Sequence, residues 1–170
     1  YIEATEKASF SKLVPIALAI LHGNLDGSIV EILEKTTDLW NFAYQINDDV
    51  TDWKKDYTEK NISFPIAMAL SEMGFDNESF AHAPPKSNAL ASVMYGSILP
   101  RCLREARDSL TKAVSQLPDS FGKSAWMGMI NDLLNHIEEK IRIIHEVLAR
   151  SVSEKHRVSQ AKLSFNGEKI

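Results

Sequence analysis

Four aspartates fall within the nine residues DDVTDWKKD. In a helix, at about 100° per residue, Asp49, Asp52 and Asp56 share one stripe of the surface. Gln45 belongs to the same stripe, and Asp48 lies beside it, one turn before Asp52. Like charges at these spacings repel one another, and Asp is a poor residue for the interior of a helix. The pattern therefore predicts that a positive charge compensates this surface.

A divalent cation is the natural candidate, because hard cations such as Mg²⁺ prefer oxygen ligands. Mg²⁺ usually binds one or two carboxylates, keeps several waters and completes its shell with substrate phosphates. A Mg²⁺ site at this cluster of aspartates is therefore one interpretation of the pattern. A purely structural alternative stays open, in which a solvated acidic helix face is paired with nearby lysines. Those lysines are Lys54, Lys55 and Lys60.

The aspartates belong to a long helical pattern, which we expect to run from Ile29 to Trp53. Its apolar residues recur every three or four positions, as on one face of a helix. Similar patterns predict helices over residues 2–21, 101–117 and 130–148. No segment alternates apolar and polar residues in the manner of a strand. The sequence therefore predicts an all-α fold with about five to seven helices.

The length and composition fit one domain with a hydrophobic core, since 44% of the 170 residues are apolar. We expect a helical domain over residues 1–150. The apolar period is lost over residues 151–170, which predicts a tail without regular structure. The chain opens at Tyr1 without Met, so we expect it to be a piece of a longer protein.

The charge balance excludes some classes of function. With 23 acidic and 19 basic residues the formal net charge is −4, which is unsuited to an extended nucleic-acid surface. No apolar run approaches the roughly 18 residues of a transmembrane segment. The single cysteine, Cys102, cannot form an internal disulfide, which favours a reducing compartment. We therefore expect a cytoplasmic protein.

The residues around the aspartates resemble the second aspartate-rich region of the trans-isoprenyl diphosphate synthase (polyprenyl synthetase) family. That region typically has an aromatic-Gln pair, a DDxxD motif, a Gly-Lys pair, a Ser-Phe-Pro or Thr-Leu-Pro triplet, and an Ala-Leu pair. The corresponding residues here are Tyr44-Gln45, Asp48-Asp49-Asp52, Lys60, Ser63-Phe64-Pro65 and Ala69-Leu70. Further matches are Tyr1 and Lys7-Ala8-Ser9 upstream, and Ala106, Leu110 and Leu117 to Ser120 downstream, ending near Lys140. The resemblance is to the C-terminal half of such an enzyme, and the family's first aspartate-rich motif is not in this chain.

The resemblance implies a helical bundle of the isoprenoid synthase type, of which this chain would be the C-terminal part. It implies a Mg²⁺-dependent prenyltransferase that ionises an allylic prenyl diphosphate and joins it to isopentenyl diphosphate or another acceptor. The implied metal ligands are Asp48, Asp49 and Asp52, and the implied catalytic residues are Lys7, Gln45 and Lys60. The lysines would contact diphosphate oxygens, and Gln45 would orient a metal-bound water. The resemblance also implies a homodimer, or a heteromer with a chain that carries the first motif.

Two other functions remain open. A class I terpene cyclase of the same fold uses a metal motif that begins Asn/Asp-Asp-x-x-Ser/Thr and ends in Glu. Asn47-Asp48 and Thr51 fit its opening, but the Glu position holds Lys55, a cation that cannot bind Mg²⁺. DDxxD is therefore the better description. The other alternative is a non-catalytic partner subunit, which keeps the fold and modulates an active chain.

The remaining reactive residues show no catalytic pattern. The five histidines are scattered without ligand spacing, and the flanks of Cys102 contain no nucleophile motif. We therefore expect Cys102 to be a packing residue. Phe10 and Phe42 are candidate walls of an apolar cavity by their helical period, with a plain core role as the alternative.

Overall fold

A computed structural model describes residues 27–166 of the chain, with side chains over 27–150 other than that of Asn77. This part contains helices and no strand, which confirms the predicted all-α class. Its elements are α3 (Gly27–Glu59), α4 (Phe64–Glu72), α5 (Asn77–His82), α6 (Ser87–Val93), the π-helical turn η1 (Met94–Ile98), α7 (Leu99–Gln116), the 3₁₀ turn η2 (Asp119–Phe121) and α8 (Ala125–Asn166). The helix predicted over residues 2–21 lies outside the described residues.

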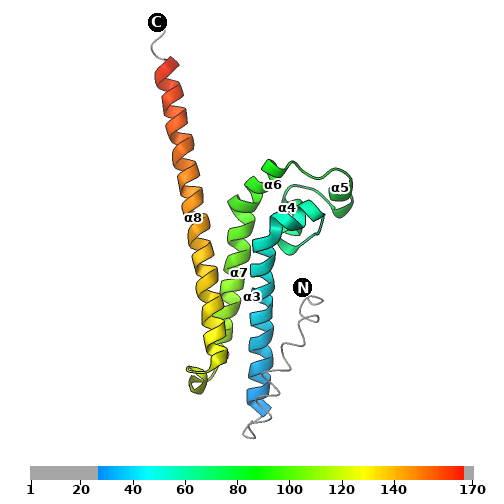
Figure 1. Cartoon of the computed structure of the whole chain (residues 1–170), viewed down its shortest axis with the longest axis vertical. Helices are drawn as coiled ribbons and strands as arrows, with labels where there is room; N and C mark the ends of the chain where they lie inside the picture. The colour runs from blue at the N-terminus through cyan, green and yellow to red at the C-terminus, as the bar shows by residue number, and fades with distance from the viewer. Residues whose placement is uncertain (1–26, 167–170) are drawn as a thin grey trace.

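Three long helices, α3, α7 and α8, form the body of this part of the chain (Figure 1). Helix α7 packs extensively against both α3 and α8. Helices α4 and α5 lie near the end of α3 where that helix terminates, and the far end of α8 extends beyond the other helices (Figure 1). The predicted aspartate helix is therefore part of the main packing unit, with α4 beside its last turns.

The buried face of α3 is the apolar stripe that predicted the helix. It carries Ala43, Ile46, Val50 and Trp53, all at most 7% exposed. These side chains form one hydrophobic cluster with the buried face of α7, which includes Leu99, Cys102, Leu103, Ala106 and Leu110. At about 100° per residue, Asp48 lies roughly 160° around α3 from Val50. Packing of the apolar stripe against α7 therefore leaves Asp48 on the opposite side of the helix.

Helix α3 continues past the predicted end at Trp53 to Glu59. It ends at Lys60, whose φ of 59° lies in the left-handed region. The N–H of Asn61 then donates to the carbonyl of Asp56 at 2.8 Å, which satisfies one of the last carbonyls of the helix. A short link leads to α4, whose first turn contains Pro65, a favourable position for proline.

Helices α6 and α7 are joined without a break through the π-helical turn η1. The N–H of Leu99 donates to the carbonyl of Met94, five residues earlier, instead of to the usual fourth residue. Pro100 follows directly and has no N–H to continue the ordinary ladder, so an extra residue is absorbed at this point. The helix predicted from Arg101 therefore begins earlier, at Leu99, and the bulge was not predicted.

Helix α8 is longer than predicted and continues to Asn166. The tail predicted from Ser151 onward is thus helical for most of its length. Residues 151–166 contain no Gly or Pro that would end a helix, although their apolar period is lost. None of the helices in the described range is long and apolar enough to cross a membrane.

Candidate metal site on helix α3

Asp48 and Asp52 lie one helical turn apart on the exposed side of α3. Neither carboxylate forms a hydrogen bond or an ion pair within 4 Å with another described residue. Two adjacent carboxylates that make no such contact repel one another across the turn. The pair therefore has the chemistry of a site for a cation and water.

The third predicted ligand, Asp49, is half-buried and takes part in two hydrogen bonds. The amide Nε2 of Gln45 donates to Asp49 Oδ1 at 2.7 Å. The backbone N–H of Phe64 donates to Asp49 Oδ2 at 3.2 Å. Both carboxylate oxygens are therefore already used within the fold, unlike those of Asp48 and Asp52.

The bond to Phe64 gives Asp49 a structural role at the start of α4. Ser63 is in the N-cap position of α4, but its side chain makes no capping hydrogen bond. Asp49 therefore supplies an acceptor for the Phe64 N–H at this helix terminus from the neighbouring helix. Burial raises the pKa of Asp49, while the hydrogen bonds from Gln45 and Phe64 act in the opposite direction.

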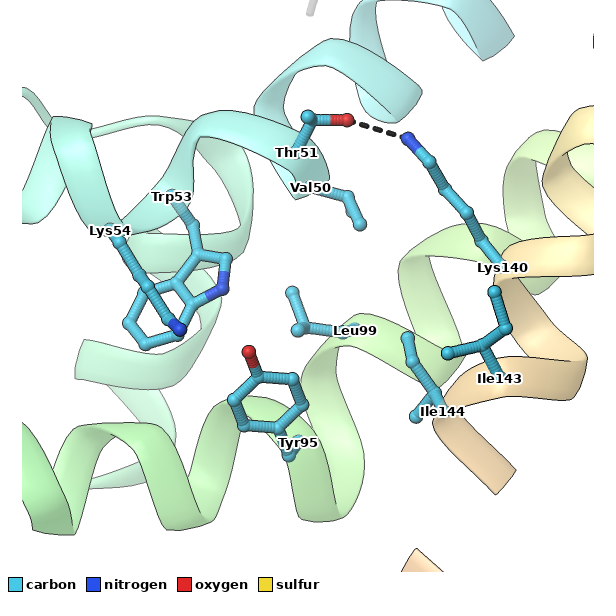
Figure 2. A pocket seen from close by; sticks show the side chains of 9 residues that line it. All are labelled: Val50, Thr51, Trp53, Lys54, Tyr95, Leu99, Lys140, Ile143 and Ile144. Atoms are coloured by element: carbon cyan, nitrogen blue, oxygen red, sulfur yellow. Dashed lines mark hydrogen bonds between the residues drawn. The ribbon is translucent and has the colours of Figure 1, made fainter. Parts of the chain in front are cut away.

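Lys140 of α8 brings a positive charge to the acidic segment of α3. Its ammonium donates to Asn47 Oδ1 at 2.7 Å. It also donates to Thr51 Oγ1 at 2.6 Å (Figure 2). Burial lowers the pKa of Lys140, and the attraction of Asp48 and Asp52 opposes that shift. The compensating charge predicted from the sequence therefore comes from α8, which lies far along the chain.

The sequence contained one signal for Lys140. It falls three residues after Ile137 and four before Ile144, both of which are buried on the apolar stripe of α8. A lysine in line with buried residues is unusual, because a charge is rarely buried without a partner. Its partner on α3 could not be identified without the packing of α8 against the other helices.

The three lysines of the structural alternative do not neutralise the aspartates. Lys54 lies over the rings of Trp53 and Tyr95, with 5.7 Å to each centroid. Lys60 donates to the carbonyl of Ala81 at 3.1 Å. Within the described residues, neither these two nor Lys55 forms an ion pair with an aspartate.

Of the two predicted diphosphate contacts, Lys60 is among the described residues. It stands directly after the end of α3, eight residues beyond Asp52. Lys7 lies outside the described residues, as does Phe10. Phe42 is partly buried and packs against the main hydrophobic cluster, which agrees with the plain core role.

The remaining candidate nucleophile is inert in this structure. Cys102 is fully buried, and burial raises the pKa of its thiol to about 12. A thiol with so high a pKa has almost no thiolate at neutral pH. Its sulfur lies 3.8 Å from that of Met68, in agreement with the expected packing role. Of the histidines, His82, His136 and His145 are exposed, and His22 and His156 are outside the range of described side chains.

The described residues contain no group of three or more His, Cys, Asp or Glu side chains arranged to hold a metal ion. Asp48 and Asp52 supply two carboxylates, and Asp49 is turned toward α4. Comparison with family models, with curated proteins and with solved structures finds no match to this chain. The features of this chain that bear on function are therefore the motif and the geometry of these residues.

Proposed function

We propose that this chain is the C-terminal part of a Mg²⁺-dependent prenyltransferase with the isoprenoid synthase fold, similar to trans-isoprenyl diphosphate synthases. Such an enzyme ionises an allylic prenyl diphosphate and joins it to isopentenyl diphosphate or another acceptor. One observation carries the proposal. Asp48 and Asp52 are exposed, one turn apart, and make no hydrogen bond or close ion pair with described residues. Two carboxylates match the usual protein contribution to a Mg²⁺ site that is completed by water and phosphate.

In this proposal Asp48 and Asp52 hold Mg²⁺, and the ion would neutralise charge on the departing diphosphate. The other residues of the segment act on the two ligands. Asp49 is a positioning residue, because its bond to Phe64 N–H fixes the start of α4 against α3. Gln45 is bonded to Asp49, so it positions that carboxylate. Lys140 reduces the mutual repulsion of Asp48 and Asp52 through its nearby ammonium.

The proposal also assigns roles to Lys7, to Lys60 and to the family's first aspartate-rich motif. Lys7 remains a candidate contact to the diphosphate on the basis of the resemblance. Lys60 would have to exchange the carbonyl of Ala81 for a phosphate oxygen to make such a contact. The family's first aspartate-rich motif would come from the preceding sequence or from a partner chain, in a homodimer or a heteromer. The single cysteine favours activity in the cytoplasm.

A second candidate function is a non-catalytic partner subunit. It is favoured by the fact that Asp49 and Lys60 are both engaged in contacts that hold the fold together. In that case the motif would have been retained for stability, and the exposed aspartates would be without a ligand. The cyclase alternative is not favoured, because the ammonium of Lys140 already occupies the side-chain oxygens of Asn47 and Thr51.

The experiment is a calorimetric melt with Mg²⁺, with inorganic diphosphate, and with both together. A site completed by phosphate should give a rise in melting temperature with both ligands that exceeds the sum of the separate rises. Asp48→Asn and Asp52→Asn should abolish this excess. Glu34→Gln is the matched control, since Glu34 is an exposed carboxylate of the same helix, far from the pair. Additive rises in the parent, or an equal loss in the control, would contradict the metal site.

A further inference from the structure

A cavity of about 230 Å³ lies between α3, the η1–α7 segment and α8 (Figure 2). Its apolar surface comes from Val50, Leu99, Ile143 and Ile144. The cavity adjoins the aspartate segment through Thr51 and Lys140, while Asp48, Asp49 and Asp52 do not line it.

The polar side chains of this cavity include two ammonium groups and no carboxylate. Lys54, Lys140, Thr51 and Tyr95 line it, and no Asp or Glu does. This is notable in a chain with a net charge of −4. Lys140 is already bonded to Thr51 and Asn47. Lys54 has no carboxylate within 4 Å among the described residues and contacts only the faces of Trp53 and Tyr95 as a cation. The Tyr95 hydroxyl forms no hydrogen bond with another described residue. The cavity thus presents positive charge and a free donor beside an apolar wall.

The backbone segment that carries Tyr95 to this cavity is a π-helical turn instead of a regular α-helix. Tyr95 lies in the π-helical turn η1, where Leu99 N–H bonds to Met94. Its ring meets that of Trp53 edge-on, with centroids 5.9 Å apart. Such turns are rare and are frequent at functional sites. The rim of the same cavity carries Ile143, a large apolar side chain that is 47% exposed. A bound apolar group would cover it.

We propose that this cavity binds a small amphiphilic anion. Its carboxylate or phosphate head would lie between the ammonium groups of Lys54 and Lys140, within reach of the Tyr95 hydroxyl. Its apolar tail would cover Val50, Leu99 and the exposed Ile143. The volume is below the ~300–1,000 Å³ of sites for drug-sized ligands, so the tail must be short. This site goes beyond the proposed prenyltransferase function and needs no divalent cation.

The test uses octanoate and octyl phosphate as probes, titrated into the full chain by isothermal calorimetry in the presence of EDTA. Both anions should bind and compete with each other, and the tighter of the two identifies the preferred head group. Octanol should bind about tenfold more weakly or worse, and octylammonium should not bind, because the donors select a negative head. Binding of octanol or octylammonium as tight as that of the anions would overturn the proposal, as would no binding of either anion. EDTA removes any contribution of Mg²⁺, so failure here leaves the metal-site proposal unaffected.

Two matched pairs of variants at exposed positions test whether the anion binds in this cavity. Lys54→Met removes a lining ammonium, whereas Lys55→Met makes the same charge change at a neighbour that does not line the cavity. Ile143→Trp fills the rim, whereas Val147→Trp adds the same bulk one turn away, at a position that is 53% exposed and outside the lining. The first member of each pair should weaken anion binding by about tenfold, and the second should leave it unchanged. Equal effects within either pair would contradict the assignment.

Discussion

Asp49 of α3 accepts a hydrogen bond from the backbone N–H of Phe64, the first residue of α4, at 3.2 Å. This contact joins the middle of the aspartate segment to the beginning of the next helix. The three predicted metal ligands therefore differ in whether their carboxylates are bonded within the fold. Asp49 holds the fold together, and Asp48 and Asp52 remain exposed.

Asp49→Ala should lower the free energy of unfolding by about 1–2 kcal/mol, because the start of α4 loses its acceptor. Asp49→Asn keeps an oxygen for the Phe64 N–H and should change stability much less. Urea denaturation followed by circular dichroism measures both values. Asp48→Ala is the control, since that carboxylate makes no such bond. Equal losses for Asp49→Ala and Asp48→Ala would contradict the capping role.

The pH dependence of stability should also report on Asp49. Burial raises the pKa of this carboxyl in the fold, so the folded chain binds its proton more readily than the unfolded chain does. The resulting stabilisation is present below the unfolded pKa and is lost as pH rises through the raised value. Asp49→Asn does not titrate. Its melting temperature should therefore rise relative to that of the parent as pH increases from the ordinary pKa of an aspartate through the raised pKa of Asp49. Parallel curves of melting temperature against pH would show that the carboxyl has no raised pKa.

Periodicity was sufficient to predict the main helices of the described part. The buried residues of α3, such as Ile46 and Val50, repeat at three and four positions, because that spacing places them on the face toward α7. The end of α3 was predicted too early. Its last turn carries charged residues that extend the helix without extending the apolar stripe, and the left-handed residue that ends it is Lys60 rather than Gly.

The site could be predicted only in part, since its partners come from distant segments. DDxxD identified the three aspartates, but the partner of Asp49 is a backbone group whose position depends on the direction of α4. Lys140 reaches Asn47 from α8, and no local pattern on α3 encodes that contact. The π-helical turn at Met94–Ile98 was missed for a different reason, because it arises from the local effect of Pro100 within a continuous helix.

Lys140→Met should destabilise the chain by about 0.5–1.5 kcal/mol, because α8 loses its hydrogen bonds to Asn47 and Thr51. Part of the loss is electrostatic, since the repulsion between the exposed aspartates is no longer offset. That part should shrink in high salt, where exposed charges are screened. Chemical denaturation at low and high salt measures both effects. Lys112→Met, at an exposed position of α7, is the control. The same salt response in both variants would contradict a specific role for Lys140.

We propose that Asp48 and Asp52 serve a ligand rather than the fold. Asp48→Ala removes a proposed ligand and relieves repulsion with Asp52, so it should be as stable as the parent or slightly more stable. It should nevertheless lose most turnover of an allylic diphosphate with isopentenyl diphosphate. The decisive measurement is melting temperature and turnover for the parent and Asp48→Ala, in an assembly that includes the first aspartate-rich motif. We expect an unchanged or raised melting temperature with turnover lost. A lowered melting temperature with unchanged turnover would contradict the proposal.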